Sequence, residues 1–233
     1  MKIAVCYSGS IRIFLDLIDT HVAHLLSKFD CDVFLETWNV YGNGGHKLKY
    51  EASKGDIISE EDKNIILDKL KPIDFNFEDY SKMENFFKEE EKKYYEGHPY
   101  ARNILSMFYK IKKCNEMVLK QNRKYDLVLR LRFDHQFLSD ANFDLPLENT
   151  LYTNEIGAWS NDIVVDQFFY GDQNVMNIVT KTYDKLDYFF KNGLVRTAPE
   201  HIFYHSLNSD KIIINKTPIS YYILTRAKGE EYH

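Results

Sequence analysis

The sequence is poor in cysteine and contains no CxxC pair. Its three cysteines, Cys6, Cys31 and Cys114, lie far apart within apolar segments of the 233-residue chain. This spacing indicates reduced thiols in a core rather than a disulfide framework or a cysteine metal site. We therefore expect a cytoplasmic protein.

Long apolar runs are also missing. Near the start of the chain, Ser8, Gly9, Ser10 and Arg12 interrupt the apolar residues before a signal-like segment is complete, so we expect no secretion signal. Elsewhere no apolar run approaches the roughly 20 residues that a membrane-spanning helix needs. We therefore expect no membrane span.

The chain has no basic stripe. Its 30 lysines and arginines are outnumbered by 35 acidic residues and are scattered along the sequence, so nucleic acid is not an expected partner. Apolar residues make up 44% of the chain, which is ample for a core, and no linker-like segment divides it. We predict a single domain over residues 1–233, with 42–96 as a candidate loop and helical insertion.

The apolar pattern predicts alternating strands and helices. Residues 2–7 have the pattern of a buried strand, residues 11–29 that of a helix, and residues 31–38 that of a second strand. Strands joined in this way are usually parallel neighbours. The predicted fold class is therefore α/β, with a Rossmann-like, mostly parallel open sheet flanked by helices. Further helices are predicted over 59–70, 78–96, 100–121, 173–191 and 199–207, and further strands over 73–77, 127–134, 150–153, 163–170 and 211–215.

The first polar cluster follows the first predicted strand. In an open α/β sheet, ligands bind beyond the carboxyl ends of the strands. Ser8, Gly9 and Ser10 leave backbone N–H groups open at the start of a helix, which favours an anion, and Arg12 would add a forked contact. The segment matches neither the GxGxxG fingerprint nor a P-loop, so a tight strand-to-helix turn remains the alternative.

The second cluster ends the strand predicted over residues 127–134. Alternation along a strand would put Arg130, Arg132 and Asp134 on one face. Buried charge is costly unless it is paired or functional, so this row indicates either a functional edge or a buried ion pair. An aspartate at such an edge would suit Mg²⁺ or Mn²⁺, which prefer oxygen ligands and bridge substrate phosphates.

The third cluster lies later in the chain. Asp166 enters an apolar strand, as either a structural hydrogen-bond centre or a general base with a raised pKa. His201 and His205 are four residues apart, which places them on one helix face, where they would pack or contribute to a metal site. The His-Glu-x-x-His arrangement of many zinc hydrolases is absent.

Taken in order, these segments resemble small nucleotide-sugar glycosyltransferases of the GT-A fold from bacteria, algae and large viruses. The resemblance spans most of the chain, and it implies that a glycosyl group passes from a nucleoside diphosphate sugar to the hydroxyl of a glycan or other acceptor. The motifs that carry it are AVCYSGSIR, DVFLETW, ILSMFYKIKKCNEM, YDLVLRLRFD, VDQFFYGDQNVM and PEHIFYHSL.

The resemblance also implies a metal site with an unusual ligand. In that family an Asp-x-Asp motif at a strand end chelates Mn²⁺ or Mg²⁺ on the diphosphate, and the matching tripeptide here is Arg132-Phe133-Asp134. Only Asp134 therefore carries over as a metal ligand, with His201 or His205 as a second, distant ligand. Either one aspartate suffices for a weaker site, or Arg132 partly replaces the cation.

The remaining roles follow from the same resemblance. An inverting enzyme needs a carboxylate base, for which Asp166 is the first candidate, with Asp162 and Glu200 behind it. Residues expected at the nucleotide are Ser8, Gly9, Ser10, Arg12, Asn103, Tyr109 and Arg132, with support of the sheet as the alternative for Asn103 and Tyr109. Trp38 and Trp159 would stack on a sugar or base or pack in the core.

Two other functions stay open at this point. The loss of the first aspartate would suit a non-catalytic nucleotide- or carbohydrate-binding module on the same fold. A phosphoryl or sulfuryl transferase is disfavoured, because the chain lacks a phosphate-gripping lysine in a complete loop motif.

Overall fold

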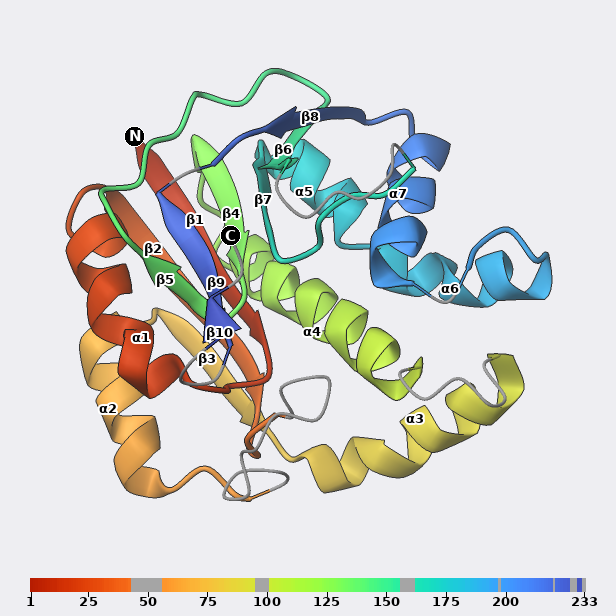
Figure 1. The fold of residues 1–233 in the computed structure, drawn as a ribbon, viewed down its shortest axis with the longest axis horizontal. Coiled ribbons are helices and arrows are strands. Elements are labelled where there is room, and N and C mark those ends of the chain that lie inside the picture. Colours follow the sequence, from red (N-terminus) through yellow and green to blue (C-terminus); the bar gives the residue numbers. More distant parts are fainter. Residues whose placement is uncertain are drawn as a thin grey trace.

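A seven-stranded sheet flanked by helices forms the centre of the protein (Figure 1). The computed structural model describes residues 1–42, 56–94, 101–155, 162–196, 198–219, 221–226 and 230–231. The strands of this sheet are β1 (Lys2–Gly9), β2 (Asp30–Trp38), β3 (Asp74–Glu78), β4 (Leu127–Leu131), β6 (Thr150–Asn154), β7 (Phe168–Gly171) and β8 (Ile213–Thr217).

The strand order is β3-β2-β1-β4-β7-β6-β8. β7 is antiparallel to β4 and β6, whereas the other neighbours in this sheet are parallel. The α/β class with a mostly parallel sheet is therefore confirmed, and the arrangement is compatible with a Rossmann-like fold. Because β2 follows on one side of β1 and β4 lies on the other, the strand order reverses at β1, and such a reversal opens a crevice at the carboxyl ends.

Helices cover both faces of the sheet (Figure 1). Alternation along β1 sends Ile3, Val5 and Tyr7 into one core and Ala4 and Cys6 into the other. The first core is closed by α1 and α2, and the second by α3 to α7. The helices are α1 (Phe14–His21), which continues as a π-helical turn over Val22–Leu26, α2 (Glu60–Leu70), α3 (Tyr80–Tyr94), α4 (Ala101–Lys120), α5 (Gln173–Val179), α6 (Thr182–Lys191) and α7 (Pro199–Ser209).

A second, three-stranded sheet was not predicted. It consists of β5 (His135–Phe137), β9 (Tyr222–Arg226) and β10 (Glu230–Glu231), in the order β10-β9-β5. β5 follows β4 after a turn of three residues, so the alternation predicted through Asp134 stops at Leu131. Arg132 and Asp134 therefore lie in a turn and not on a strand face, because the chain leaves the main sheet here to pair with β9.

Two further predictions need correction. Residues 163–167 are not a strand, because their backbone is bonded elsewhere: Val164 N–H donates to the Glu200 carbonyl, and the Asp166 carbonyl accepts from Arg130. The helix predicted over 173–191 is two helices, α5 and α6. At the break, the hydroxyls of Thr180 and Thr182 bond to backbone carbonyls of the preceding turn, as these side chains often do where helices bend.

Part of the range 42–96 contributes directly to the sheet. α2 begins at the predicted N-cap, where Ser59 Oγ accepts a hydrogen bond from Asp62 N–H at 3.0 Å. β3 then pairs in parallel with β2 as the outer strand. Residues 43–55 of this range lie outside the described residues.

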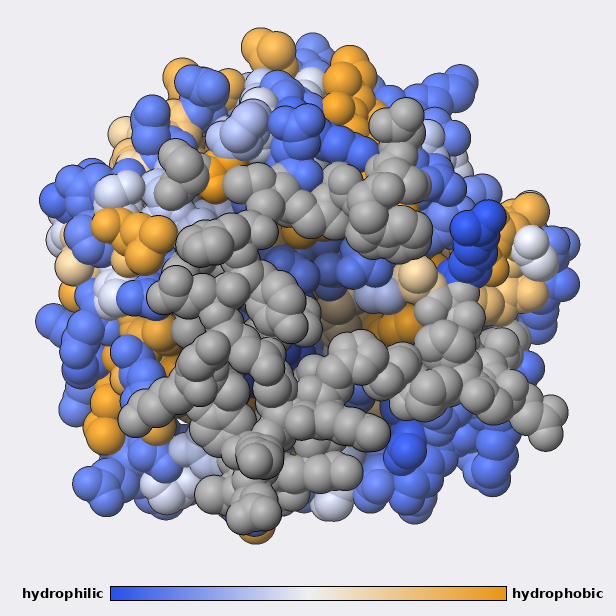
Figure 2. Space-filling model, in the orientation of Figure 1, coloured by the Kyte–Doolittle hydropathy of each residue, from blue (hydrophilic) through white to orange (hydrophobic). Residues whose placement is uncertain are grey.

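The surface shown in Figure 2 is mainly hydrophilic, and its apolar side chains form small separate groups. Across the described ranges, no helix is both long and apolar enough to cross a bilayer. The three cysteines are free, with Cys6 and Cys114 buried.

Two buried histidines, His21 and His135, connect β5 to the main core through hydrogen bonds. His21 Nε2 lies 2.6 Å from the His135 carbonyl, which accepts only, so this nitrogen carries the proton and Nδ1 accepts from the Tyr7 hydroxyl at 3.0 Å. Likewise, His135 Nδ1 donates to the Arg132 carbonyl, and its buried Nε2 has no hydrogen-bond partner in the described part of the chain. Burial lowers the pKa of His21 to about 4 and that of His135 to about 3.

These histidines predict a loss of stability in mild acid. Between pH about 6.5, where an unfolded histidine titrates, and pH about 4, the unfolded chain binds protons that the folded chain does not, so the free energy of unfolding should fall as the pH falls. His135→Phe should reduce this loss of stability by roughly 1–3 kcal/mol, because phenylalanine does not bind a proton. The phenyl ring should fit at this position, because its neighbours Phe168 and Tyr222 are aromatic. Urea unfolding at pH 4 to 7 measures it, and an unchanged pH dependence in the variant would contradict the assignment.

Candidate functional site

Polar side chains are buried at the carboxyl end of the sheet, beneath α4. Glu36, Ser8 and Arg130 lie on the neighbouring strands β2, β1 and β4, and alternation turns all three toward α4. All three are buried. We call Glu36, Ser8 and Arg130 the polar row. The polar row crosses the point where the strand order reverses, so a ligand bound at the carboxyl ends of these strands would lie above it.

Arg130 holds one end of the polar row. Its guanidinium donates to Ser8 Oγ at 3.1 Å, to the Ser8 carbonyl and to the Asp166 carbonyl, and it thereby joins β1, β4 and the segment before β7. Burial lowers the pKa of Arg130 to about 10, against the opposing effect of the Asp166 carboxylate. The side chain is therefore still charged at neutral pH.

Lys110 of α4 covers the other end. Its ammonium donates to Glu36, to Glu78 at 2.6 Å and to the Thr37 carbonyl at 3.0 Å, and it lies 3.7 Å from the centre of the Trp38 ring. Burial raises the pKa of Glu36, and Lys110 opposes this rise. The buried ammonium fixes the first half of α4 over the ends of β2 and β3.

Beside the polar row, one aspartate binds two arginines. Arg12 Nη1 lies 2.8 Å from Asp134 Oδ2, and Arg132 donates from Nε to Oδ1 at 3.0 Å and from Nη2 to Oδ2. We call Arg12, Arg132 and Asp134 the Asp134 cluster. The carboxylate is enclosed, with 2% of its side chain exposed, whereas 15% of Arg132 and 26% of Arg12 remain exposed.

The charge state of Asp134 follows from these contacts. Burial alone would raise the pKa of Asp134, but the positive charges of Arg132 and Arg12 outweigh burial and hold the pKa well below its usual range. Asp134 is therefore ionised at all physiological pH values and acts as the counter-ion of both guanidinium groups.

An aromatic pocket lies at the ends of β2 and β3, beside the start of α4. Its volume is about 820 Å³, and its walls include the rings of Trp38, Tyr41 and Tyr80. Ser10 and Asn103 also line this aromatic pocket, so the loop that carries Arg12 to Asp134 borders the pocket as well.

A glycine closes this loop against the pocket wall. Gly42 N–H donates to the Ile11 carbonyl at 2.9 Å, and a Cβ atom at Gly42 would come within 2.2 Å of Ser10 Cβ. Only glycine allows this approach. Gly9, the last residue of β1, has a φ of +121°, a conformation that favours glycine at the turn out of the strand.

The structure brings most of the expected nucleotide-site residues together. Ser8 is in the polar row, Arg12 and Arg132 are in the Asp134 cluster, and Ser10 and Asn103 line the aromatic pocket. Tyr109 is set back from the pocket: its ring stacks on Trp38, and its hydroxyl donates to Glu78 at 3.1 Å. Trp159 lies outside the described residues.

The expected base candidates occupy three different settings. Asp166 is buried, and its charge acts on Arg130 and Arg132. Glu200, in the first turn of α7, is also near enough to raise the pKa of Arg132. Asp162 is half exposed and lies 3.7 Å from His201 Nε2, so it faces α7 rather than the Asp134 cluster.

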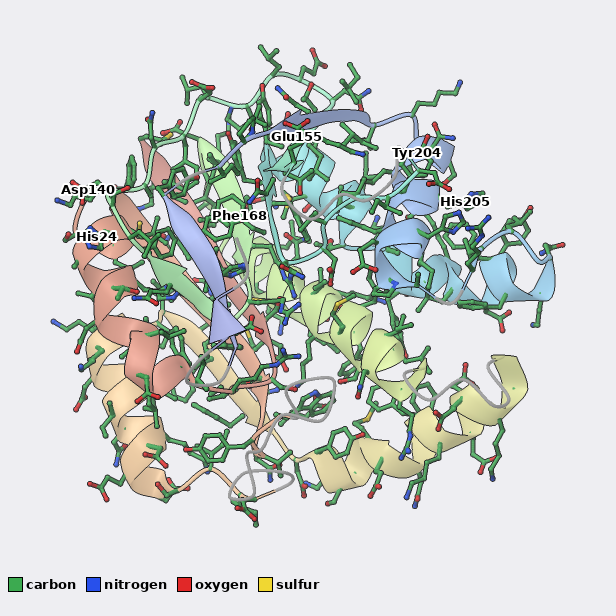
Figure 3. The ribbon with its side chains drawn as sticks, viewed as in Figure 1. His24, Asp140, Glu155, Phe168, Tyr204 and His205 are labelled. Carbon is green, nitrogen blue, oxygen red and sulfur yellow. The ribbon has the colours of Figure 1, made fainter. Side chains whose placement is uncertain are left out.

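The expected histidine ligands make contacts with other residues. His201 Nδ1 accepts from Arg196 N–H at 3.2 Å. The His205 ring packs edge-on against Phe189 of α6, with centroids 4.8 Å apart, and burial and His201 lower its pKa. Figure 3 shows His205 on α7. Arg132, Arg12 and His135 each lower the pKa of Asp134.

The residues present therefore do not fit a divalent cation at Asp134. Both carboxylate oxygens already accept guanidinium N–H groups, and neither His201 nor His205 joins them. Two unit charges 4 Å apart interact by about 4 kcal/mol at an effective dielectric constant of about 20, so two adjacent arginines would strongly oppose a second cation. Within the described ranges, no group of three or more His, Cys, Asp or Glu side chains is arranged to hold a metal ion.

Sequence reasoning missed the role of Lys110. A signal was present, because Lys110 is three residues after Met107 and four before Cys114, on the apolar face of its helix. A lysine at such a position needs a buried acidic partner. Glu36, an acidic residue within the apolar strand 31–38, is the partner that the sequence offers.

Comparison with known proteins gives no assignment. The chain matches no family model, and no curated protein is significantly similar to it. Its function must therefore be argued from its own residues and geometry.

The buried ammonium predicts a large stability effect. Lys110→Met should lower the free energy of unfolding by about 3–5 kcal/mol, because Glu36 and Glu78 lose their shared cation in a buried site. Urea unfolding measures this change. The matched control is Lys113→Met on the same helix, whose more exposed pair with Glu116 should contribute less than about 1 kcal/mol.

A second variant distinguishes charge from packing. Adding Glu36→Gln to Lys110→Met should restore part of the lost stability, because the uncompensated buried charge is removed. A single Lys110→Met variant as stable as the Lys113→Met control would contradict the role given to Lys110.

Proposed function

We propose that the protein is a nucleotide-sugar-dependent glycosyltransferase with a GT-A-like fold. One observation carries this proposal: two partly exposed arginines lie where the strand order reverses, and the loop that carries Arg12 also borders the aromatic pocket through Ser10. A ligand that fills both must combine an anionic group with flat ring systems. A nucleoside diphosphate sugar has this composition.

The size and lining of the aromatic pocket support the nucleoside part of the proposal. Its volume of about 820 Å³ lies within the roughly 300–1,000 Å³ usual for small-molecule sites. Tyr41 and Tyr80 line the pocket with their rings, and the amide of Asn103 offers hydrogen bonds to a base or a sugar. The diphosphate would then lie toward Arg12 and Arg132, whose guanidinium forks suit phosphate oxygens.

The same residues would assist the chemistry. In transfer with inversion, the acceptor oxygen forms a bond to the anomeric carbon as the bond from that carbon to the diphosphate breaks, and the hydroxyl proton passes to a carboxylate. Asp166 is the first candidate for this base, with Asp162 and Glu200 as the others. The arginines would stabilise the negative charge that develops on the departing diphosphate.

A non-catalytic module that binds the same ligands is the second candidate. It is favoured by one observation, the arginine at position 132 where the resembling family has an aspartate. Binding without turnover would identify this module.

The proposal predicts stabilisation by nucleotides. A ligand that binds only the folded state raises the melting temperature, so a panel of nucleoside diphosphates and nucleotide sugars should contain at least one that raises Tm by several degrees at a saturating concentration. Thermal unfolding monitored by fluorescence measures the shift. If no nucleoside diphosphate and no nucleotide sugar changes Tm, with or without Mn²⁺, the proposed function is wrong.

Turnover then separates the enzyme from the module. The nucleotide sugar that binds best should be hydrolysed slowly in the absence of an acceptor, and Asp166→Asn should lower this rate by roughly 10²- to 10⁴-fold with little change in Kd. The matched control is Asp187→Asn on α6, an exposed carboxylate paired with Lys191, which should leave the rate unchanged. Binding by the wild-type protein without any release of nucleoside diphosphate would favour the module.

A further inference from the structure

We propose that the Asp134 cluster binds the diphosphate through its guanidinium groups without a divalent cation, and that Asp134 is the counter-ion that positions these groups. This inference deepens the proposed function and rests on it for the identity of the ligand. It concerns the position at which the sequence resemblance implies Mn²⁺ or Mg²⁺.

The occupancy of the carboxylate is the first reason. Three guanidinium N–H groups already reach its two oxygens, one from Arg12 and two from Arg132. A carboxylate has about four lone-pair positions, so a metal ion would have to displace an arginine or share the carboxylate with two positive charges. Neither arrangement suits a hard cation that needs several oxygen ligands.

The order of exposure is the second reason. The exposed fractions of the side chains are 26% for Arg12, 15% for Arg132 and 2% for Asp134, so the guanidinium groups cover the carboxylate. A ligand that arrives from solvent therefore meets the two cations first. Within the described part of the chain, Arg132 bonds to Asp134 through Nε and Nη2, which leaves Nη1 as a donor for an incoming anion.

The change of charge is the third reason. Where the resembling family has an aspartate, this chain has Arg132, which replaces a negative charge by a positive one. A site that gains two charge units in this way repels cations and attracts anions. The forked geometry of arginine also suits phosphate oxygens, so the guanidinium group can serve the charge-balancing role of a metal ion.

Acidic neighbours limit this attraction. Asp166 and Glu200 both act on Arg132, and Asp166 also acts on the buried Arg130. Counted together with Arg130, Asp166 and Glu200, the cluster has three positive and three negative charges, so its preference for anions depends on which groups face solvent. Anion binding should accordingly require the intact fork of Arg132 and not merely a positive charge.

The decisive experiment measures anion binding with and without a metal ion. Isothermal titration calorimetry is carried out with inorganic pyrophosphate, UDP and GDP, once in EDTA and once in Mn²⁺. For each anion that binds, the Kd should differ by less than about twofold between the two conditions. Arg132→Lys, which keeps the charge and removes the fork, should weaken binding in EDTA by about tenfold or more. Arg12→Lys, at the more exposed position, is the second variant and should act in the same direction.

A matched control is available at the other end of the sheet. Arg123 lies 2.9 Å from Asp32 near the amino end of β2, so Arg123→Lys changes an arginine–aspartate pair of similar distance outside the site. This control should keep the wild-type Kd. Circular dichroism and Tm establish that each variant is folded.

A second measurement tests the metal directly. The electron paramagnetic resonance signal of free Mn²⁺ is measured during titration with the protein, without any nucleotide. The wild-type protein and Asp134→Asn should give the same signal, because Asp134 does not bind Mn²⁺. Bound Mn²⁺ that is lost in Asp134→Asn would overturn the inference. Anion binding that requires Mn²⁺, or the absence of binding by pyrophosphate and by both nucleotides in EDTA, would also overturn it.

These outcomes separate the inference from the proposed function. If pyrophosphate binds in EDTA but no nucleotide or nucleotide sugar binds, the cation-independent anion site stands and the glycosyltransferase proposal fails. If nucleotide sugars bind and are hydrolysed only with Mn²⁺, the glycosyltransferase proposal stands and the inference fails.

Discussion

Charge buried at the carboxyl ends of the strands constrains the rest of this structure. Arg130 and Lys110 are enclosed by the sheet and α4, where an unpaired charge would be strongly destabilising. Each is therefore held by fixed partners: Arg130 by Ser8 and the Asp166 carbonyl, and Lys110 by Glu36 and Glu78. These contacts join β1 to β4, and α4 to β2 and β3, so the pairing of charge also sets where the elements lie.

The candidate site is a consequence of that pairing. With Arg130 committed to the polar row, the exposed cations beside it are those of the Asp134 cluster, and Asp134 holds them in one orientation. Arg12 comes from the segment after β1, and Arg132 from the turn after β4. The site is thus preorganised by residues about 120 positions apart in the sequence, because β1 and β4 are neighbours at the reversal of strand order.

Sequence reasoning reached part of this arrangement. The rule that ligands bind beyond the carboxyl ends of parallel strands put Ser8 and Arg12 in one predicted cluster and Arg132 and Asp134 in another at the same edge of the sheet. The structure brings Arg12, Arg132 and Asp134 into contact. The contact of Arg12 with Asp134 does not follow from the sequence. Periodicity predicts which face of a strand or helix a residue lies on, and not which residue of another segment it contacts. The alternating pattern also predicts a strand through Asp134, because the turn Arg132-Phe133-Asp134 contains neither of the residues, glycine and proline, that usually mark a turn.

The sequence by itself determined the α/β class, most of the helices and strands, and the types of charged residue available at the strand ends, because hydrophobic periodicity and N-caps are local properties. Only the tertiary structure decided which charges face each other. It paired Lys110 with Glu36 and Glu78, and it placed the Asp134 carboxylate against the guanidinium groups of Arg12 and Arg132. The physical reason is that the interaction between charges depends on their distance and burial, which are properties of the folded chain and not of the order of its residues.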